Sequence, residues 1–174
     1  MNIQELEGKR IAVLLSGGVD SSVVVYEFAR LGLHPDCFYI KIGPEEKEDW
    51  DCNSEEDLEM ATLVARRFGC KLEVIDCHKE YWGQVTKYTM EKVRAGFTPN
   101  PDVMCNKEIK FKAFLDYAMK LGADYVATGH YVRILHEEKN GKIKSVMLRG
   151  IDDNKDQTYF LCQLTQEQLE KVLF

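Results

Sequence analysis

A buried-strand pattern runs directly into a glycine-rich turn and then into a helical pattern near the start of the chain. Residues 11–15 read IAVLL, an unbroken apolar run typical of a strand that is covered on both faces. The turn SGGVDSS at 16–22 follows at once, and the helical pattern from 23 to 31 ends at Gly32, as helices commonly do. This order of strand, loop and helix predicts one unit of an α/β fold.

Further strand and helix patterns alternate along the chain. Ser54 offers an N-cap to the second helix, and the segment 96–105, which contains two prolines, predicts a loop. Strands that alternate with helices indicate a parallel sheet covered on both faces. The expected strands lie at 37–42, 71–75 and 125–127. The expected helices run from the Ser54 cap to Gly69, over 81–95, and from the end of the 96–105 loop to near Leu121.

The pattern changes after residue 131. Two apolar runs, 132–135 and 143–148, flank an Asn-Gly pair, which is typical of an antiparallel hairpin. Thr165 caps a last helical pattern that continues to Phe174, so we expect a piece of a longer protein. The 174 residues predict a single domain spanning 1–174.

Composition limits the possible functions. A net charge of -6 argues against a protein that coats nucleic acid, because such binding needs many cations, so any contact with nucleic acid must be local. Acidic residues crowd 45–59, whereas lysines and an arginine recur over 87–112. The chain lacks a long apolar stretch and a secretory or transit signal, which predicts no membrane role and a cytoplasmic location. The six cysteines have no zinc-finger or disulfide-framework spacing.

The turn at 16–22 has the chemistry of an anion site. Gly17 and Gly18 allow successive N–H groups to point at one spot, the helix N-terminus adds partial positive charge, and the hydroxyls of Ser16, Ser21 and Ser22 add donors. The alternative is a tight turn in which the serines and the aspartate at 20 cap the helix. No lysine follows the glycines and GxGxxG is absent, which excludes a Walker loop and a dinucleotide fingerprint.

A second candidate site is the segment 98–106, TPNPDVMCN. Cys105 is expected where this loop becomes a helix, and the helix dipole together with Lys107 and Lys110 would lower the pKa of its thiol. Asp102 is a candidate general acid or base. Taken singly, the cysteine would be a buried apolar residue and the aspartate a turn or cap residue. Their place in one proline-stiffened loop favours a preorganised site.

These two segments resemble known families. SGGVDSS resembles the PP-loop of the ATP pyrophosphatases, which cleave ATP between its first and second phosphates, transfer AMP to a substrate oxygen and release pyrophosphate. TPNPDVMCN, followed by KEIKF at 107–111, resembles the hallmark of tRNA-specific 2-thiouridylases, and EYW, FLDYA, LGADYVATGHY and KDQTYFL follow in the order of that family. The resemblance covers nearly the whole chain. It implies a doubly wound parallel sheet of the adenine nucleotide alpha hydrolase type, in which the hairpin is a C-terminal appendage.

The resemblance also implies roles for single residues. Cys105 would be the nucleophile and Asp102 a second catalytic residue. Without the resemblance, the histidine at 130 would be an ordinary hydrogen-bonded residue and KDQ at 155–157 a solvated turn. The implied ATP site comprises Leu14, Leu15, Ser16, Gly17, Gly18, Val19, Asp20, Ser21, Ser22, Ile40 near the adenine, and Gly129; the implied tRNA contacts are Asn100, Pro101 and Asp102 at the target base, with His130, Lys155, Asp156 and Gln157.

The implied reaction is adenylation of a uridine oxygen with ATP and Mg²⁺, followed by replacement of that oxygen by sulfur. The implied partners are the tRNAs for lysine, glutamate and glutamine, and a persulfide carrier or a cysteine desulfurase relay. No residue of this chain is predicted to be a metal ligand.

The chain departs from the family pattern in three respects. The second cysteine of the family and its later tRNA-binding domains lie beyond residue 174, and Cys162, expected in a packed element, is no substitute. We therefore expect ATP binding but incomplete sulfur transfer from this chain. Ile40 stands where the family more often has methionine, a swap between apolar side chains of similar size.

Two rival functions remain open, and each can be distinguished from tRNA thiolation. A PP-loop ligase that forms amides would not need this thiol, and a nucleotide-binding module that regulates a partner would release no pyrophosphate.

Overall fold

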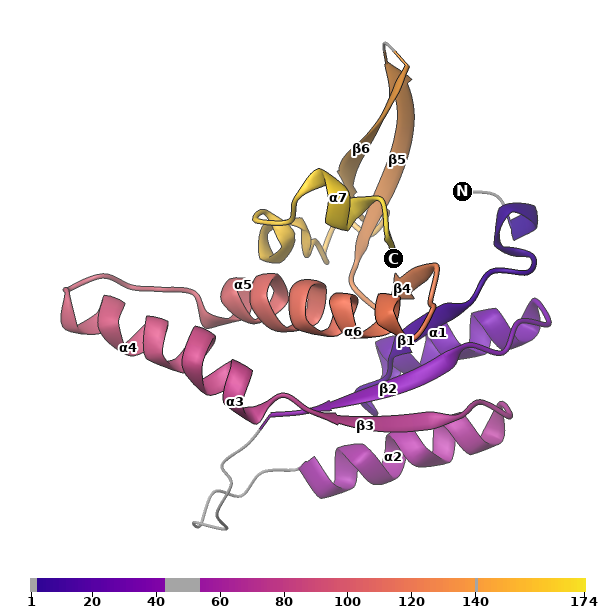
Figure 1. Cartoon of the computed structure of the whole chain (residues 1–174), viewed down its shortest axis with the longest axis horizontal. Coiled ribbons are helices and arrows are strands. Elements are labelled where there is room, and N and C mark those ends of the chain that lie inside the picture. The colour runs from indigo at the N-terminus through magenta and orange to yellow at the C-terminus, as the bar shows by residue number, and fades with distance from the viewer. Residues whose placement is uncertain (1–2, 43–53, 140) are drawn as a thin grey trace.

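The computed structural model describes residues 3–42, 54–139 and 141–174. Within this part of the chain, five parallel strands form one sheet in the order β3-β2-β1-β4-β7 (Figure 1). The predicted parallel sheet is therefore confirmed. The strands are β1 (Ile11–Leu14), β2 (Asp36–Lys41), β3 (Leu72–Asp76), β4 (Tyr125–Ala127) and β7 (Val172–Leu173).

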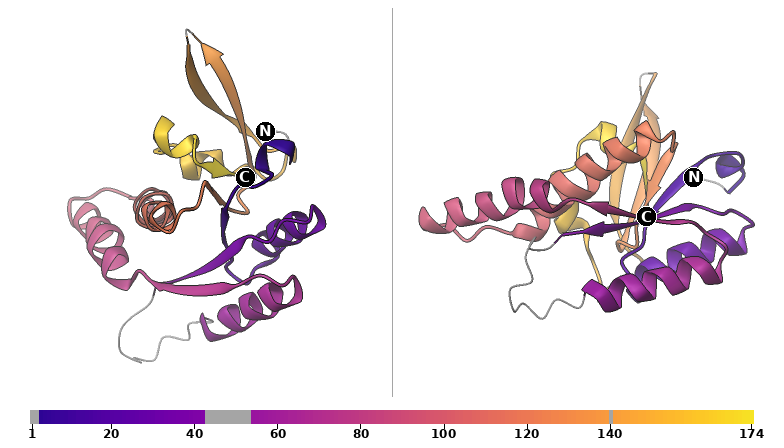
Figure 2. Two further views of the ribbon diagram at one scale, coloured as in Figure 1. Left: turned by 45° about the vertical axis from the view of Figure 1, so that its right-hand side comes forward. Right: turned by 60° about the horizontal axis from the view of Figure 1, so that its bottom comes forward.

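Helices cover both faces of the sheet, as a doubly wound fold requires (Figures 1 and 2). On one face, α1 (Val19–Arg30) and α2 (Ser54–Arg67) pack against side chains of β1 that include Val13. On the other face, Ala12 and Phe38 pack against the helix that runs from 101 to 120. That helix consists of α5 (Pro101–Met104), the π-helical segment η3 (Cys105–Phe114) and α6 (Leu115–Lys120).

The third predicted helix is longer than expected and has a π-helical centre. It comprises α3 (His78–Tyr81), η2 (Trp82–Thr86) and α4 (Lys87–Arg94), which follow one another without a break. Two short 3-10 helices, η1 (Ile3–Leu6) and η4 (Thr158–Leu161), lie elsewhere in the chain.

The predicted hairpin is present. Its strands, β5 (Val132–Lys139) and β6 (Lys142–Arg149), are antiparallel, and they project away from the sheet (Figure 2). Gly141 has a φ of 71°, which suits a tight hairpin turn because glycine adopts positive φ without steric cost.

Two sequence predictions about element ends were wrong. The loop predicted at 96–105 ends at Asn100, because the Asn100 side chain accepts hydrogen bonds from the N–H groups of Asp102 and Val103 and Pro101 suits the first helical position. The last helix, α7 (Gln166–Leu169), does not continue to Phe174. Instead Val172 pairs with Val126 and extends the sheet by a fifth strand.

Some expectations fall outside what the structure describes, namely the side chain of Ser54 and the acidic residues at 45–51. In the described ranges, no helix is both long enough and apolar enough to span a membrane.

Candidate active site

The strand order places two loops at one point of the sheet. From β1 the chain goes to β2 and β3 on one side, and later to β4 and β7 on the other, so the order reverses between β1 and β4. The turn at 16–22 leaves the carboxyl end of β1, and residues 128–130 leave the carboxyl end of β4. In open α/β sheets, ligands bind at this kind of switch point.

The PP-loop serines hold the loop rather than cap the helix. The hydroxyls of Ser21 and Ser22 donate to the carbonyl of Gly18 at 3.0 and 2.9 Å, and the N–H of Ser16 donates to Ser21 Oγ at 3.2 Å. The first turn of α1 has no side-chain cap. The capping alternative is therefore wrong, and the N-terminal N–H groups of α1 remain without a side-chain cap to meet an anion.

Two glycines permit close backbone approaches around the loop. Gly17 has a φ of 86°, and a Cβ at this position would overlap the backbone carbonyl of Asp57 at the start of α2. A Cβ on Gly129 would lie 2.8 Å from the carbonyl carbon of Asp20. Gly129 therefore allows the loops after β1 and β4 to approach this closely, and Gly17 allows the turn to approach the start of α2.

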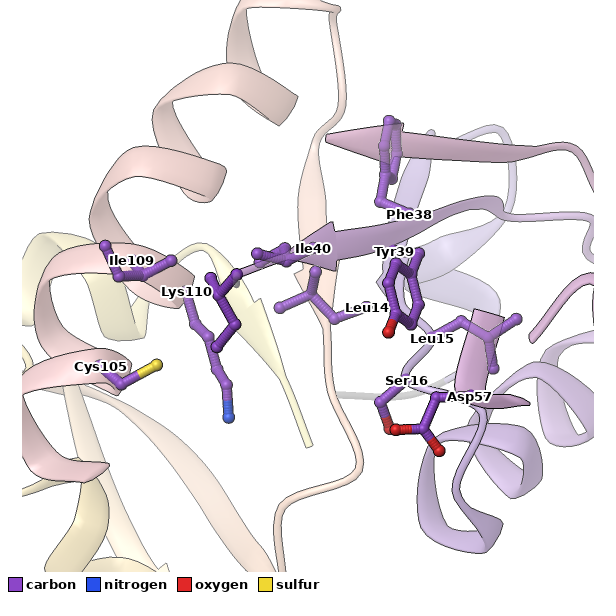
Figure 3. Close-up of a pocket in the computed structure, with 11 residues that line it drawn as sticks. Leu14, Leu15, Ser16, Phe38, Tyr39, Ile40, Asp57, Cys105, Ile109 and Lys110 are labelled. Atoms are coloured by element: carbon purple, nitrogen blue, oxygen red, sulfur yellow. The ribbon is translucent and has the colours of Figure 1, made fainter. Parts of the chain in front are cut away.

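One cavity of about 360 Å³ joins the two segments singled out in the sequence (Figure 3). Leu14, Leu15 and Ser16 line one side, Ile40 lies at the end of β2, and Cys105 faces them from η3. Phe38, Tyr39, Ile42, Asp57, Ile109 and Lys110 complete the lining. The structure thus places the thiol and the start of the PP-loop in one cavity.

A second cavity of about 290 Å³ opens beside the first and shares Leu14, Ser16 and Lys110 with it. Asp20 and Ser21 of the PP-loop line it on one side. The opposite side consists of Thr128, Gly129, His130 and Gln157. Lys110 therefore lies where the two cavities meet.

The surroundings of Cys105 contradict one sequence prediction. The thiol lies inside a continuous helix, beyond the cap at Asn100, so it is not at a helix N-terminus. Burial raises its pKa above the ordinary 9.0, the charge of Lys110 acts to lower it, and Asp102 acts to raise it. The predicted lowered pKa is wrong, and of the two lysines proposed to assist, Lys107 instead pairs with Glu108 at 3.6 Å.

The KDQ segment is tied to the PP-loop. Lys155 Nζ donates to Asp20 Oδ2 at 2.9 Å, and the Tyr131 hydroxyl donates to Asp20 Oδ1 at 3.0 Å. The Lys155 ammonium also lies 3.9 Å from the centre of the Tyr131 ring. Lys155, as the largest cause, lowers the pKa of Asp20. The segment is therefore attached to the PP-loop, although its side chains remain partly exposed as in the alternative of a solvated turn.

The other two residues of KDQ have partners of their own. Gln157 accepts a hydrogen bond from the N–H of Tyr131 at 2.8 Å. Asp156 accepts hydrogen bonds from Arg149 at 2.9 Å and from the Thr158 hydroxyl at 2.8 Å. These contacts attach the segment to the base of the hairpin.

His130 is a partly buried, hydrogen-bonded histidine that also lines the second cavity. Its Nδ1 lies 2.8 Å from the Thr128 hydroxyl, and its ring packs against those of Phe111 and Phe174. Burial, followed by the charge of Lys110, lowers its pKa to about 4. The imidazole is therefore neutral near pH 7.

Several predicted site residues line neither cavity. The side chain of Asn100 is engaged as a helix cap, and Val19 is 78% exposed. The others outside both linings are Gly17, Gly18, Ser22, Pro101, Asp102, Lys155 and Asp156. The sequence also gave no signal for Asp57 or Tyr131, and Lys110 was considered only as a neighbour of the thiol.

The described residues contain no group of three or more His, Cys, Asp or Glu side chains placed to hold a metal ion. Asp57 lines the first cavity and Asp20 the second, each beside Ser16 or Ser21 of the PP-loop. Mg²⁺ is commonly bound by one or two carboxylates together with substrate phosphates, so the Asp57 carboxylate fits an ion that arrives with a nucleotide. Both carboxylate oxygens of Asp20 already accept hydrogen bonds, from Lys155 and Tyr131.

Comparison with known proteins identifies the family. The model of the tRNA methyl transferase HUP domain matches residues 9–174. The tRNA-specific 2-thiouridylase MnmA of Lactococcus lactis subsp. lactis is 52% identical over 165 residues, covering 95% of this chain and 43% of the relative. The protein of the same name from Bacillus licheniformis is 49% identical over 168 residues, covering 97% of this chain and 44% of the relative. The chain thus spans less than half the length of these relatives.

Solved structures support the fold alone. A predicted subunit of a tRNA methyltransferase from Methanocaldococcus jannaschii is 16% identical with a TM-score of 0.51, over 95% of this chain and 66% of that chain. A glutamine-dependent NAD+ synthetase from Acinetobacter baumannii, in complex with ADP, is 16% identical with a TM-score of 0.50, over 72% of this chain and 23% of that chain. The family model and the curated relatives confirm the resemblance seen in the motifs, and the chain belongs to the tRNA methyl transferase HUP domain family.

Proposed function

We propose that this chain is the ATP-using catalytic part of an enzyme that thiolates position 2 of the wobble uridine of tRNA. The observation that carries the proposal is the shared cavity in which Ser16, Ile40 and Cys105 meet. The relatives named 2-thiouridylase support this reaction over the methyl transfer in the family's name, because methyl transfer needs no ATP cleavage and no nucleophile beside a PP-loop.

ATP would lie along the ends of β1 and β2. The uncapped N–H groups in the first turn of α1 would meet the phosphates, and Ile40 offers an apolar contact for the adenine. A PP-loop has no lysine of its own, and Lys110 brings an ammonium group to the same place from η3. Gly129 also lines the second cavity beside β4, where it would contact the nucleotide.

Adenylation is the first chemical step. The uridine O2 attacks the α-phosphorus, the bond from this phosphorus to the bridging oxygen breaks, and pyrophosphate leaves. Mg²⁺, when bound, neutralises charge on the departing pyrophosphate. The uridine 2-oxygen alone is a poor leaving group. After adenylation it can leave as part of AMP.

Sulfur transfer is the second step. The terminal sulfur of a persulfide attacks C2, and AMP leaves with the former uridine oxygen. The base is then joined to the donor through a disulfide between the sulfur on C2 and the inner sulfur of the donor. The thiolate of Cys105 then attacks the donor sulfur of that bond, releases 2-thiouridine and forms a disulfide with the donor. The raised pKa of Cys105 means that its thiol needs a base or a nearby cation for this attack, and Lys110 is the cation that faces it.

The RNA contacts belong to the same proposal. Asn100, Pro101 and Asp102 would meet the target base, with Asp102 as general acid or base, and His130, Lys155, Asp156 and Gln157 would contact the tRNA. The proposed substrates are the tRNAs for lysine, glutamate and glutamine, and the persulfide comes from a carrier or a cysteine desulfurase relay. We place the reaction in the cytoplasm.

The test is to assay the intact protein that carries this chain with ATP labelled in the α-phosphate. We expect pyrophosphate release that depends on tRNA, and transfer of labelled AMP to the wobble uridine. Cys105→Ser should retain this adenylation and lose 2-thiouridine formation. An amide-forming ligase would be indifferent to Cys105→Ser, a regulatory module would release no pyrophosphate, and a methyl transferase would modify tRNA without ATP cleavage.

A further inference from the structure

The chain from the end of α4 to the following loop is exposed on every side. No residue of α4 is buried, and every residue from 90 to 98 is exposed. The exposed side chains include apolar ones, since Val93 is 58% and Phe97 63% exposed. In Figure 1, α4 extends beyond the edge of the sheet. Apolar groups left exposed on a projecting helix are typical of an interaction surface.

The end of this helix holds an ordered cluster of aromatic and cationic groups. Gly96, with a φ of 83°, ends the helix, and the N–H of Phe97 donates to the carbonyl of Lys92 at 2.9 Å, which folds Phe97 back onto the helix. The Lys92 ammonium lies 5.4 Å from the centre of the Phe97 ring and 5.7 Å from that of Tyr88. These are cation–π distances, so the ring is held in place before any partner arrives.

The charge of this segment differs from that of the whole chain. Residues 78–97 contain four cations, Lys79, Lys87, Lys92 and Arg94, and two carboxylates, Glu80 and Glu91, whereas the chain as a whole has a net charge of -6. None of the ion pairs in the described part of the chain involves these cations. Such cations remain available to a polyanion.

The base of the helix is fixed to the element that carries the thiol. Val85 of η2 packs with Ile109 of η3, and Tyr81 and Cys105 lie against the same cluster. Beyond Phe97, the chain leads within three residues to Asn100 and α5. The exposed end of α4 is therefore joined, by packing and by sequence, to the cavity in which the target base is proposed to react.

We infer that the α4 tip, defined as Lys87, Lys92, Val93, Arg94 and Phe97, binds the single-stranded loop of the RNA substrate. This inference rests on the proposed function, because it assigns a surface to the same substrate. A base stacks on the Phe97 ring, and the cations meet backbone phosphates on either side. Cations around an exposed aromatic ring favour RNA over a protein partner, whose interface core would be depleted of charge.

The first experiment measures binding of an anticodon stem-loop RNA with uridine at the wobble position, over a series of salt concentrations. The double variant K87Q/R94Q removes two phosphate contacts, so the slope of log K against log salt should decrease in magnitude by about 1.4, at about 0.7 per phosphate on a single strand. The matched control is R66Q/R67Q in the last turn of α2, on the opposite face of the sheet, which should leave the slope unchanged.

The second experiment removes the ring. Phe97→Ala should weaken binding about tenfold through the loss of one stacked base, whereas Phe97→Trp should retain the wild-type affinity. If the wild type shows RNA-dependent pyrophosphate release but the tip variants bind RNA like their controls, the inference fails and the proposed function stands. If the tip variants abolish self-association while RNA affinity is unchanged, the tip is a protein interface and the inference fails. If the wild type shows no RNA-dependent pyrophosphate release, the proposed function fails first.

Discussion

Lys110 is the side chain through which the parts of the candidate site are linked. It lines both cavities, and its charge acts on the titration of Cys105 and of His130. In the sequence Lys110 stands five residues after the thiol and far along the chain from the PP-loop at 16–22. Only the packing of η3 over the ends of β1 and β2 brings the ammonium to the cavities that the PP-loop lines.

The thiol of Cys105 should lose its proton at a higher pH than an ordinary cysteine, and at a still higher pH when Lys110 is replaced. Because burial raises its pKa above 9.0, alkylation by iodoacetamide should increase mainly above pH 9. In Lys110→Gln the cation that opposes this shift is gone, so the rise should move to higher pH. Lys112→Gln is the control, because Lys112 pairs with Glu108 at 2.8 Å and is not among the causes of the shift. Identical profiles for the wild type and Lys110→Gln would contradict the assigned role of Lys110.

Asp20 should contribute to stability in a pH-dependent way. Its pKa is lowered in the folded chain from 3.8, so its ion pair with Lys155 stabilises the fold above about pH 4, and this contribution is lost as the pH falls through the lowered pKa. Both side chains are about 40% exposed, so the effect should stay within about 1 kcal/mol. Chemical denaturation of the wild type and Asp20→Asn should show a difference at pH 7 that disappears in acid. A difference that grows in acid would contradict the assignment.

Gly17→Ala should destabilise the protein more than an alanine substitution at a glycine that has a positive φ but open space around it. The new Cβ would require a strained φ, which costs of order 1–3 kcal/mol, and would also overlap the backbone of Asp57. Gly8→Ala is the matched control, because Gly8 also has a positive φ, of 75°, but open space around its Cβ position. Thermal unfolding and ATP binding should both be impaired more in Gly17→Ala, and equal effects of the two variants would contradict the close approach of α2.

At the scale of elements, β7 is the part of the sheet that the sequence did not predict. Val172 and Leu173 are too few residues to show a strand period, and they follow the pattern of α7 closely enough to look like its continuation. These residues form a strand because they pair with β4, and this pairing leaves Val172 only 1% exposed.

Val172→Ala should therefore lower the free energy of unfolding by about 2 kcal/mol, since it removes buried methyl groups and leaves a cavity. The same change at Val93, which is 58% exposed, should stay within about 0.5 kcal/mol. Urea denaturation of both variants gives the comparison, and equal small effects would mean that β7 does not close the sheet.

The elements that the sequence predicted well have strong local signals. The run at 11–15, the PP-loop and the Asn-Gly hairpin each fix their conformation through neighbouring residues. The elements that it placed badly depend on particular long-range or capping contacts. The loop at 96–105 ended early because Asn100 caps α5, and the π-helical segments η2 and η3 have no period that the sequence would reveal.

At the scale of the whole molecule, the site is assembled across long distances in sequence. Asp20 and Lys155 are 135 residues apart and make an ion pair, and Cys105 faces Leu14 across a cavity. The sequence motifs named most of these residues, but the pairing of KDQ with the PP-loop and the burial of the thiol came from the fold. The first of these features joins residues 155–157 to the PP-loop.

The proposed reaction requires one cavity to present ATP, a uridine oxygen and Cys105 to one another. The measurement that tests it most directly is mass spectrometry of nucleosides from tRNA of cells that lack the protein carrying this chain, with and without complementation. We predict that 2-thiouridine derivatives at the wobble position are lost, are restored by the wild type and are not restored by Cys105→Ser. Normal 2-thiouridine in the deleted strain, or full restoration by Cys105→Ser, would contradict the account.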